Sequence, residues 1–291
     1  MTISATTKLV ALLGYPVAHS LSPRIHNMAF QAQGLDCVYV ALPVPPSGVA
    51  AAVAGLKAMG FLGANVTVPH KQAVVPLMDV LSPEAQAVGA VNTIVCRRDG
   101  EAVTLYGDNT DVAGFLEPLH PFADRLKDMP MLIFGAGGAA RAVAFALLST
   151  LRPRRLTIAA RTTTNAERLV RDLAPCDPTG ALRVVPVADA RSDVQASRLL
   201  VNATPLGMSP HLEGTPWPEA GTFTEAQIVY DLIYHPEHTR LLRDAAGRGA
   251  HTIGGLDMLI LQAAASYVQW TGCVMPVNRV RRMLRQHAVD E

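Results

Sequence analysis

Short apolar runs alternate along this chain with stretches in which apolar residues recur at helical spacing. The runs at residues 9–13, 61–64, 94–96 and 131–134 are each followed by glycine or polar residues, which predicts buried strands that end in turns. Strands that alternate with amphipathic helices are typical of βα units and of a parallel sheet. We therefore predict an α/β fold.

The second half of the chain continues this pattern. Residues 156–160 and 229–234 predict further strands of the sheet that begins at residue 131, and we expect 229–234 to be its last strand. Residues 118–130 are charged and bounded by proline, which indicates a connection between two domains. Residues 255–287 predict helices. The positions at helical spacing that we expect to face a core are Leu256, Leu259, Ile260, Ala263 and Ala264.

A polar segment follows the run at 61–64 and reads Asn65-Val-Thr-Val-Pro-His-Lys71. Ligands of open α/β sheets bind just outside the carboxyl ends of the strands. If Asn65, Thr67 and Lys71 point the same way, they offer hydrogen bonds and one positive charge to a polyhydroxylated substrate. The alternative is a surface turn with a solvated lysine.

Other polar side chains lie next to predicted strands and helices. Ser22 is the expected N-cap of a helix with Pro23 at its first position. The hydroxyls of Ser20 and Ser22 could face a ligand carboxylate there, because a helix N-terminus favours an anion. Asn92 precedes one predicted strand, and Asp111 precedes a helical pattern. The alternative is that the serines and Asp111 serve only as helix caps and turn formers.

The strand at 131–134 opens directly into a glycine cluster, and we expect a helix over residues 141–150. In the dinucleotide-binding fingerprint the first glycine permits a tight turn and the second lets the backbone approach the pyrophosphate. The third small residue keeps the helix close to the strand. The candidate cofactor-binding residues of this cluster are Gly135, Ala136, Gly137, Gly138 and Ala139, with Ala140 in the third small position.

The strand at 156–160 is followed by Arg161 and Thr162. An NAD-specific site usually has an acidic residue here, which binds the ribose 2′-hydroxyl. A guanidinium instead matches a 2′-phosphate through two parallel hydrogen bonds. The sequence therefore favours NADP(H) as the cofactor.

Four segments of the first half, in this order, resemble the shikimate dehydrogenase family: Gly-Tyr-Pro-Val-Ala-His-Ser-Leu-Ser-Pro, Asn-Val-Thr-Val-Pro-His-Lys, Gly-Ala-Val-Asn-Thr and Gly-Asp-Asn-Thr-Asp. Later segments that begin at Gly135, Asn202 and Gly255 fit as well, so the resemblance covers nearly the whole chain. It implies an oxidoreductase that reversibly reduces 3-dehydroshikimate to shikimate with NADPH, in aromatic amino-acid (chorismate) biosynthesis.

The resemblance also implies a role for each candidate residue. Lys71 would give a proton to the carbonyl oxygen of the substrate, and Asp111 would hold Lys71 in position. Ser20 and Ser22 would bind the substrate carboxylate. The other substrate-binding residues would be Asn65, Thr67, Asn92, Tyr234 and Gln262, and the further cofactor-binding residues Thr204, Met208 and Gly255.

The place of Gln262 also bears on the domains. Since the family binds a substrate hydroxyl with a glutamine at this place, the last helices should return to the first domain. We predict a discontinuous substrate-binding catalytic domain, residues 1–115 plus 256–291, with a mixed or parallel sheet. Residues 116–255 would form a Rossmann-type NADP-binding domain.

The chain departs from the family pattern beside Arg161. NADP-preferring members tend to read Asn-Arg-Thr with a second arginine three residues later, whereas this chain has Ala160 and Asn165. An NAD-dependent quinate/shikimate dehydrogenase is therefore one alternative. The other is a non-catalytic binding or regulatory protein on the same scaffold, against which the presence of Lys71 and Asp111 argues.

Composition narrows the class of protein without identifying it. The chain has 291 residues, of which 49% are hydrophobic and 17% charged, with a net charge of +1. These values are typical of a soluble globular protein and argue against nucleic acid as the partner. No segment approaches the roughly 18 apolar residues of a membrane span. We expect a cytoplasmic enzyme with a small-molecule substrate, either a monomer or a homodimer.

Cysteine and histidine usage gives no sign of a metal site or a disulfide framework. The histidines nearest the polar segments, His19, His26 and His70, have neither a close helical pairing nor a carboxylate cluster, so we predict no metal. The cysteines are widely spaced and are expected to be reduced core thiols: Cys37, Cys96, Cys176 and Cys273.

Overall fold

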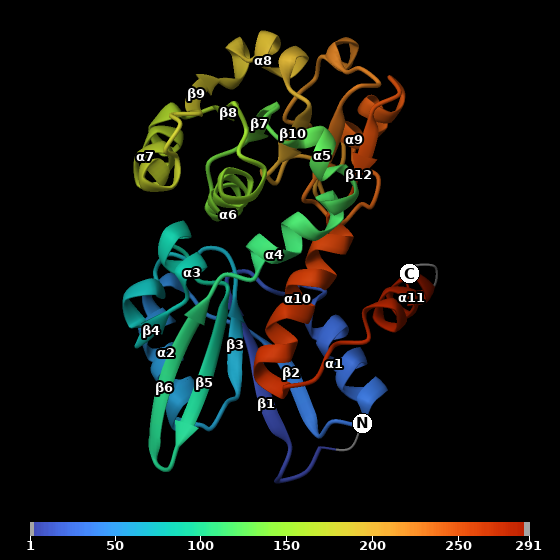
Figure 1. The fold of residues 1–291 in the computed structure, drawn as a ribbon. Helices are drawn as coiled ribbons and strands as arrows, with labels where there is room; N and C mark the ends of the chain where they lie inside the picture. The colour runs from blue at the N-terminus through green and yellow to red at the C-terminus, as the bar shows by residue number, and fades with distance from the viewer. Residues whose placement is uncertain (1–2, 288–291) are drawn as a thin grey trace. The chain divides into compact units, whose positions relative to one another are not determined.

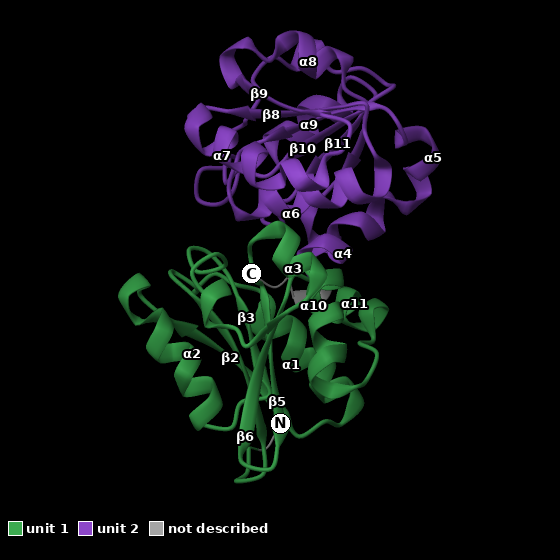
Figure 2. Cartoon of the chain, turned by 60° about the vertical axis from the view of Figure 1, so that its left-hand side comes forward, with its two compact units in different colours: residues 1–110, 260–291 green, residues 111–259 purple. Residues whose placement is uncertain are grey.

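The structure is a computed structural model that describes residues 3–287 (Figure 1). The chain forms two compact units (Figure 2): unit 1 comprises Met1–Thr110 and Ile260–Glu291, and unit 2 comprises Asp111–Leu259. Residues 288–291, which we assigned to the first predicted domain, lie outside the described residues. Each unit has its own six-stranded sheet with helices packed on it, so the predicted α/β class is confirmed.

The sheet of unit 1 is mixed and has the order β2-β1-β3-β5-β6-β4. Strand β1 pairs in parallel with β2 and β3, whereas β5 runs antiparallel to β3 and β6. Figure 2 shows α2 on one face of this sheet and α1, α10 and α11 on the other. The strands are β1 Lys8–Gly14, β2 Cys37–Pro43, β3 Gly63–Val66, β4 Val80–Leu81, β5 Thr93–Asp99 and β6 Ala102–Asp108; the helices are α1 Ser22–Gln33, α2 Val49–Ala58, α3 Pro83–Val88, α10 Gly255–Thr271 and α11 Val277–His287. The first five residues of α10, 255–259, belong to unit 2.

The register of unit 1 brings polar residues together where the inner strands β3, β5 and β6 start or end. Asn65 at the end of β3 pairs with Thr93 at the start of β5, and Thr93 pairs with Asp108 at the end of β6. The strand that we predicted at 61–64 begins two residues later, at Gly63, and extends to Val66. Asn65 therefore lies within β3 and not in the following turn. At their opposite ends, β5 and β6 are joined by an exposed turn at Gly100, whose φ of 59° suits glycine.

The buried face of helix α10 differs in part from the face that we predicted. Ile260 and Ala263 are buried as expected, but Leu256, Leu259 and Ala264 are only partly buried. The buried stripe includes two polar residues, Gln262 and Ser266. Hydrophobicity alone could not locate this stripe, because its polar members face other polar groups of the protein.

The sheet of unit 2 is entirely parallel and has the order β12-β11-β10-β7-β8-β9. This is the doubly wound dinucleotide-binding arrangement, with the topological switch point between β7 and β10. The strands are β7 Pro130–Phe134, β8 Arg155–Ala160, β9 Leu182–Pro186, β10 Leu199–Asn202, β11 Ile228–Asp231 and β12 His251–Ile253; the helices are α4 Asp111–Leu116, α5 Ala123–Leu126, α6 Gly138–Ala146, α7 Thr163–Leu173, α8 Arg191–Ala196 and α9 Arg240–Ala246.

Two predictions for unit 2 were wrong. Residues 229–234 do not form the last strand, because β11 ends at Asp231 and β12 forms the edge of the sheet. The chain turns after Asp231, whose carboxylate accepts a hydrogen bond from the backbone N–H of Ile233 at 3.1 Å. The helix expected over 141–150 begins earlier, at Gly138, and its last turn, Leu147–Leu151, is a π-helix.

Three further findings concern the expected cofactors and partners. Among the described residues, no helix is long and apolar enough to span a membrane, and no three His, Cys, Asp or Glu side chains are grouped to hold a metal ion. All four cysteines are free thiols. Cys37 and Cys96 are buried as predicted, but Cys176 and Cys273 are only partly buried.

Candidate active site

The segment that follows β3 lies beside the end of β1. The Thr67 N–H donates to the carbonyl of Leu13 at 2.9 Å, and the Tyr15 N–H donates to the carbonyl of Val68 at 3.0 Å. A Cβ atom at Gly14 would fall 2.3 Å from Cγ2 of Thr67, so only glycine allows this approach. The side chains of Thr67 and Lys71 are partly buried.

Asn65 is the centre of a buried hydrogen-bond network in unit 1. Its side chain is 4% exposed, which makes the surface-turn alternative wrong for this residue. Its Nδ2 donates to the carbonyl of Asn92 at 3.1 Å and to the Ser266 hydroxyl at 3.3 Å. Its Oδ1 accepts from the Tyr39 hydroxyl at 2.9 Å. These contacts fix the orientation of the amide.

Asn92 connects this network to helix α10 and to Thr110, two residues after the end of β6. Its Nδ2 lies 3.5 Å from Oε1 of Gln262 and donates to the Thr110 hydroxyl at 3.0 Å. Its Oδ1 accepts from the Thr110 N–H at 2.7 Å. Thr110 is followed directly by Asp111, which begins α4 in unit 2. The structure therefore brings Asn65, Asn92 and Gln262 together.

The two serines lie at the start of α1, and Ser22 is not the N-cap that we predicted. Helix α1 begins at Ser22, with Leu21 as the N-cap in helical conformation (φ −80°, ψ −9°), so the prediction of Ser22 as N-cap was wrong. The hydroxyl of Ser20 accepts instead from the Ser22 N–H at 3.2 Å. The Ser22 hydroxyl hydrogen-bonds with Tyr39, the neighbour of Asn65, and it opposes the rise that burial causes in the pKa of Tyr39.

A buried histidine supports this part of the site. His26 is fully buried and stacks on Tyr39 with ring centroids 4.4 Å apart, close to Trp270 at 5.3 Å. Neither ring nitrogen has a hydrogen-bond partner of good geometry among the described residues. Burial lowers the pKa of His26 to about 3, an effect that the nearby Asn65 side chain opposes. His26 is therefore a neutral ring in an aromatic stack and does not indicate a metal ligand.

This histidine should make stability depend on pH. Since the pKa of His26 is about 3 in the folded state and its ordinary value is 6.5, the unfolded state binds the extra proton between these pH values. The free energy of unfolding should therefore fall as the pH drops from 6.5 towards 3, by up to about 1.4 kcal/mol per pH unit from this residue. Urea unfolding of the wild type and of His26→Phe at several pH values would measure this contribution. Parallel pH profiles would contradict it.

In unit 2 the glycine cluster forms the turn between β7 and α6. Gly135 has a φ of 103°, and a Cβ there would lie 2.9 Å from Cγ2 of Thr204. An added Cβ at Gly137 would meet no heavy atom within 4 Å, so the space over the first turn of α6 is open. Gly137 is the N-cap, and no side chain caps the helix. Free backbone N–H groups at an open helix N-terminus fit the pyrophosphate of a dinucleotide.

The end of β8 lies next to this turn. The Gly135 N–H donates to the carbonyl of Ala159 at 2.9 Å, and Arg161 and Thr162 follow with exposed side chains. At the place of the second family arginine, Asn165 accepts a hydrogen bond from Arg168 at 3.3 Å. The positively charged side chain directly after β8 is therefore that of Arg161.

The remaining candidates of unit 2 follow β10 and β11. Met208 is 43% exposed, and the neighbouring Ser209 N–H donates to the carbonyl of His235 at 3.2 Å. Burial raises the pKa of Tyr234. A Cβ at Gly255 would lie 2.2 Å from the carbonyl oxygen of Leu232, which explains the glycine by packing alone.

Several polar residues that support these loops were missed from the sequence. In unit 2, Asn202 hydrogen-bonds with Asp231, which is completely buried and also accepts from Thr239. In unit 1, Tyr39 and Ser266 hold Asn65. The available signal was a polar residue within or directly after an apolar run, as at Asn202, and at Asp231, which we had placed inside the strand predicted over residues 229–234.

The candidates divide between the two units. Those in unit 1 are Ser20, Ser22, Asn65, Thr67, Lys71, Asn92 and Gln262; those in unit 2 are Asp111, Tyr234, Gly135, Ala136, Gly137, Gly138, Ala139, Arg161, Thr162, Thr204, Met208 and Gly255. Within unit 2, the switch point brings Gly135 and Thr204 into contact.

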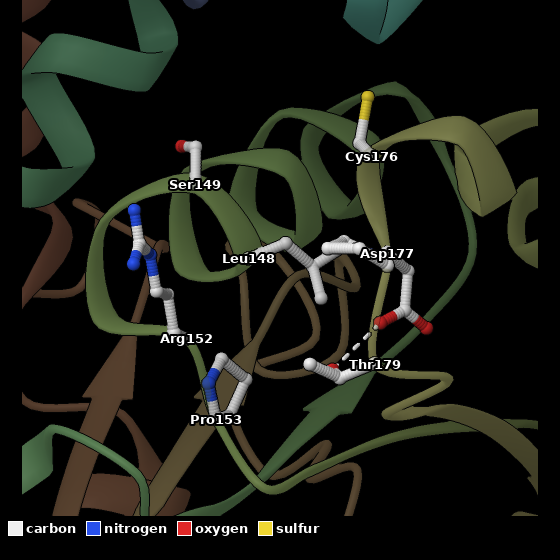
Figure 3. Close-up of a pocket in the computed structure, with 8 residues that line it drawn as sticks. Leu148, Ser149, Arg152, Pro153, Cys176, Asp177 and Thr179 are labelled. Carbon is white, nitrogen blue, oxygen red and sulfur yellow. Dashed lines mark hydrogen bonds between the residues drawn. The ribbon is translucent and has the colours of Figure 1, made fainter.

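A pocket at the other end of the second sheet is not part of this site (Figure 3). It has a volume of about 410 Å³ and is lined by residues that precede β8 and β9, among them Arg152 and Asp177. Asp177 accepts hydrogen bonds from the N–H groups of Ala181 and Leu182 and from the Thr179 hydroxyl. Its carboxylate therefore serves to order the loop.

Comparison with known proteins agrees with this geometry. Residues 12–94 match the model of the shikimate dehydrogenase substrate binding domain, and residues 255–285 match that of the shikimate 5'-dehydrogenase C-terminal domain. The chain is 60% identical to shikimate dehydrogenase (NADP(+)) of Salinibacter ruber over 287 residues, which are 98% of this chain and 99% of that protein.

Solved structures are similar over the same length. A shikimate dehydrogenase crystallised in complex with NADP+ superposes with a TM-score of 0.90 at 38% identity, over 98% of this chain and 97% of that chain. A quinate dehydrogenase of Corynebacterium glutamicum in complex with NAD superposes with a TM-score of 0.87 at 31% identity, over 96% of this chain and 99% of that chain.

Proposed function

The chain belongs to the shikimate dehydrogenase family, and we propose that it catalyses the reversible, NADPH-dependent reduction of 3-dehydroshikimate to shikimate. The observation that carries this proposal is the match of nearly the whole chain to relatives with that name. The polar network of unit 1 and the glycine turn of unit 2 supply the binding groups that the two reactants need. The product feeds aromatic amino-acid biosynthesis.

Unit 2 would bind the cofactor. The backbone N–H groups of Gly137 and Gly138 would hold the pyrophosphate at the N-terminus of α6, and Arg161 with Thr162 would hold the 2′-phosphate. When bound, NADPH supplies the hydride. Thr204 supports the glycine turn from the neighbouring loop.

Unit 1 would bind the substrate. Ser20 and Ser22 at the start of α1 would hold the carboxylate, where the helix terminus favours an anion. Asn65, Thr67, Asn92, Asp111 and Gln262 would divide the ring hydroxyls. Tyr234 matches a family tyrosine near the substrate. The Nζ of Lys71 would give a proton to the carbonyl oxygen as it becomes an alkoxide. Asp111 is the carboxylate partner that the family pattern implies.

The proposal is tested by initial rates of the purified protein with shikimate and with quinate, each with NADP+ and with NAD+. Reaction of shikimate with NADP+ alone is the expected result. A folded protein that binds shikimate but reduces neither cofactor would overturn the proposal in favour of a non-catalytic role.

A second candidate is an NAD-dependent quinate/shikimate dehydrogenase. Ala160 and Asn165, which replace the asparagine and the second arginine of NADP-preferring members, favour it. Comparable rates with NAD+, or with quinate, would decide for this candidate.

Arg161 should determine most of the preference for NADP+. Replacing it with alanine removes a charged, bidentate partner of the 2′-phosphate, so we expect the KM for NADP+ to rise about 10- to 100-fold. The KM for NAD+, which lacks that phosphate, should change little. Arg168→Ala, on the exposed face of α7, is the matched control. An equal loss with both cofactors would contradict this role of Arg161.

We also propose a cytoplasmic protein, monomeric or homodimeric, with neither nucleic acid nor a membrane as partner. The net charge of +1 and the absence of a basic block support this.

A further inference from the structure

Asp231 is a buried carboxylate at the end of β11 that the proposed reaction does not use. Its side chain has no exposed surface. Its Oδ1 accepts from Nδ2 of Asn202 at 2.9 Å and from the Ile233 N–H at 3.1 Å. Its Oδ2 accepts from the Thr239 hydroxyl at 2.7 Å. Three donors, one at the end of β10 and two in the loop that follows β11, therefore converge on one carboxylate.

From Asp231 the hydrogen bonds lead to the glycine turn. The Oδ1 of Asn202 accepts from the hydroxyl of Thr204 at 2.7 Å and from its N–H at 3.0 Å. The Thr204 hydroxyl in turn accepts from the Leu206 N–H at 3.2 Å. The methyl group of Thr204 lies against Gly135, where an added Cβ would be 2.9 Å away. Each contact constrains the next, so the carboxylate orients the loop that follows β10.

The other two donors constrain the loop that follows β11. The carbonyl of Ile233 accepts from the Gly255 N–H at 3.1 Å, at the start of α10. Thr239 is the N-cap of α9, and its hydroxyl accepts from the Leu242 N–H at 3.3 Å. Asp231 therefore fixes the loops after β10 and β11 relative to each other, next to the switch point of the sheet.

The protein keeps this carboxylate at a cost in stability. Burial raises the pKa of Asp231 to about 6, although the three donated hydrogen bonds oppose the shift. Burying an ionised group costs desolvation free energy, and an apolar residue of similar size often stabilises a core equally well. Buried polar networks that are fully satisfied give geometric precision instead.

We propose that Asp231 is a positioning residue, which holds the loop at residues 203–208 against the Gly135 turn and thereby sets the affinity for NADP(H). This inference rests on the proposed function, since it assigns the turn to the cofactor. Asp231 acts through Asn202 and Thr204, and it touches neither reactant.

Direct titration of the full-length protein with NADPH, followed by the fluorescence of the nicotinamide, tests the proposal without turnover. Asp231→Ala removes both acceptor oxygens, and with them the three hydrogen bonds, and should raise the Kd for NADPH about 10-fold or more. Asp231→Asn should restore most of the affinity, because its amide oxygen can still accept from Asn202 and Ile233. Asp193→Ala is the matched control: Asp193 is a buried carboxylate of the same unit that accepts from Thr157 and Arg183, and its loss should leave the Kd unchanged.

The outcomes separate this inference from the function itself. Wild-type affinity in a folded Asp231→Ala protein would overturn the positioning role while leaving the proposed function intact. Failure of the wild type to bind NADPH would overturn the proposed function. A purely structural role would lower the melting temperature of Asp231→Ala and of Asp193→Ala with no change in Kd for either.

If Asp231→Ala does not fold, Thr239→Val provides the measurement. It keeps the shape of the side chain and removes only the hydroxyl that Asp231 accepts from, so the Kd should rise about 3-fold. A Kd equal to that of the wild type would then overturn the proposal.

Discussion

Lys71→Ala should lower kcat for shikimate oxidation by about 100- to 10,000-fold, the range that a positioned proton donor or acceptor contributes. The alkoxide that forms during reduction, and the hydroxyl that loses its proton during oxidation, would both lack a partner in this variant. The KM for shikimate should change much less, because the residues of unit 1 that we propose to bind its hydroxyls remain.

Two further variants make this result specific. Lys57→Ala removes an exposed lysine of unit 1 that pairs with Asp79, and it should have wild-type kinetics. Ser22→Ala should mainly raise the KM for shikimate, by about 10-fold, because it removes a hydrogen bond to the carboxylate. If Lys71→Ala mainly raised the KM and Ser22→Ala mainly lowered kcat, the two roles would have to be exchanged.

Trp270→Ala should lower the free energy of unfolding of unit 1 by about 3–5 kcal/mol, the usual cost of removing a buried tryptophan. Trp270 is 7% exposed, and its Nε1 donates to the carbonyl of Ile94 at 2.9 Å. It also covers Gly63, where an added Cβ would lie 2.4 Å from that Nε1. The loss would leave a cavity between α10 and the strands that carry the proposed substrate-binding residues.

The two tryptophans allow each unit to be followed separately. Trp217 is buried in unit 2, and in Trp270→Ala it is the one tryptophan that remains. In Trp270→Ala, the midpoint of urea unfolding followed by circular dichroism should therefore move to a lower urea concentration. The midpoint followed by the fluorescence of Trp217, which reports on unit 2, should stay the same. Trp270→Phe keeps an aromatic ring and loses the hydrogen bond, so its midpoint by circular dichroism should lie between those of the wild type and of Trp270→Ala. An unchanged circular dichroism midpoint in Trp270→Ala would contradict the assigned packing.

The sheets were predictable because local patterns encode them. Strands β1, β7 and β8 are mostly apolar runs, and the turn at Gly135 needs a residue that tolerates a φ of 103°. The edge strand β12 has only three residues, none of them fully buried, so it lacks the hydrophobic pattern that identifies a strand. Helix α1 was displaced by one position, because Leu21 adopts helical angles and moves Ser22 into the first turn.

The supporting contacts could not be predicted, because they join residues far apart in sequence. Asn202 and Asp231 are 29 positions apart and meet through the pairing of β10 and β11. Asn65 and Ser266 are 201 positions apart and meet only when α10 packs on the first sheet. A sequence indicates which side chains are polar; the pairing of strands and helices decides which of them become partners.

The hairpin of β5 and β6 offers a practical point of attachment. Its turn at Gly100 is exposed, and an added Cβ there would meet nothing within 4 Å. The seven residues of β5, Thr93–Asp99, span about 20 Å from the polar end of the strand to this turn, at the usual rise of a strand. An affinity tag, a fluorophore or a surface linker placed here could immobilise the enzyme with its substrate-binding edge facing away from the support.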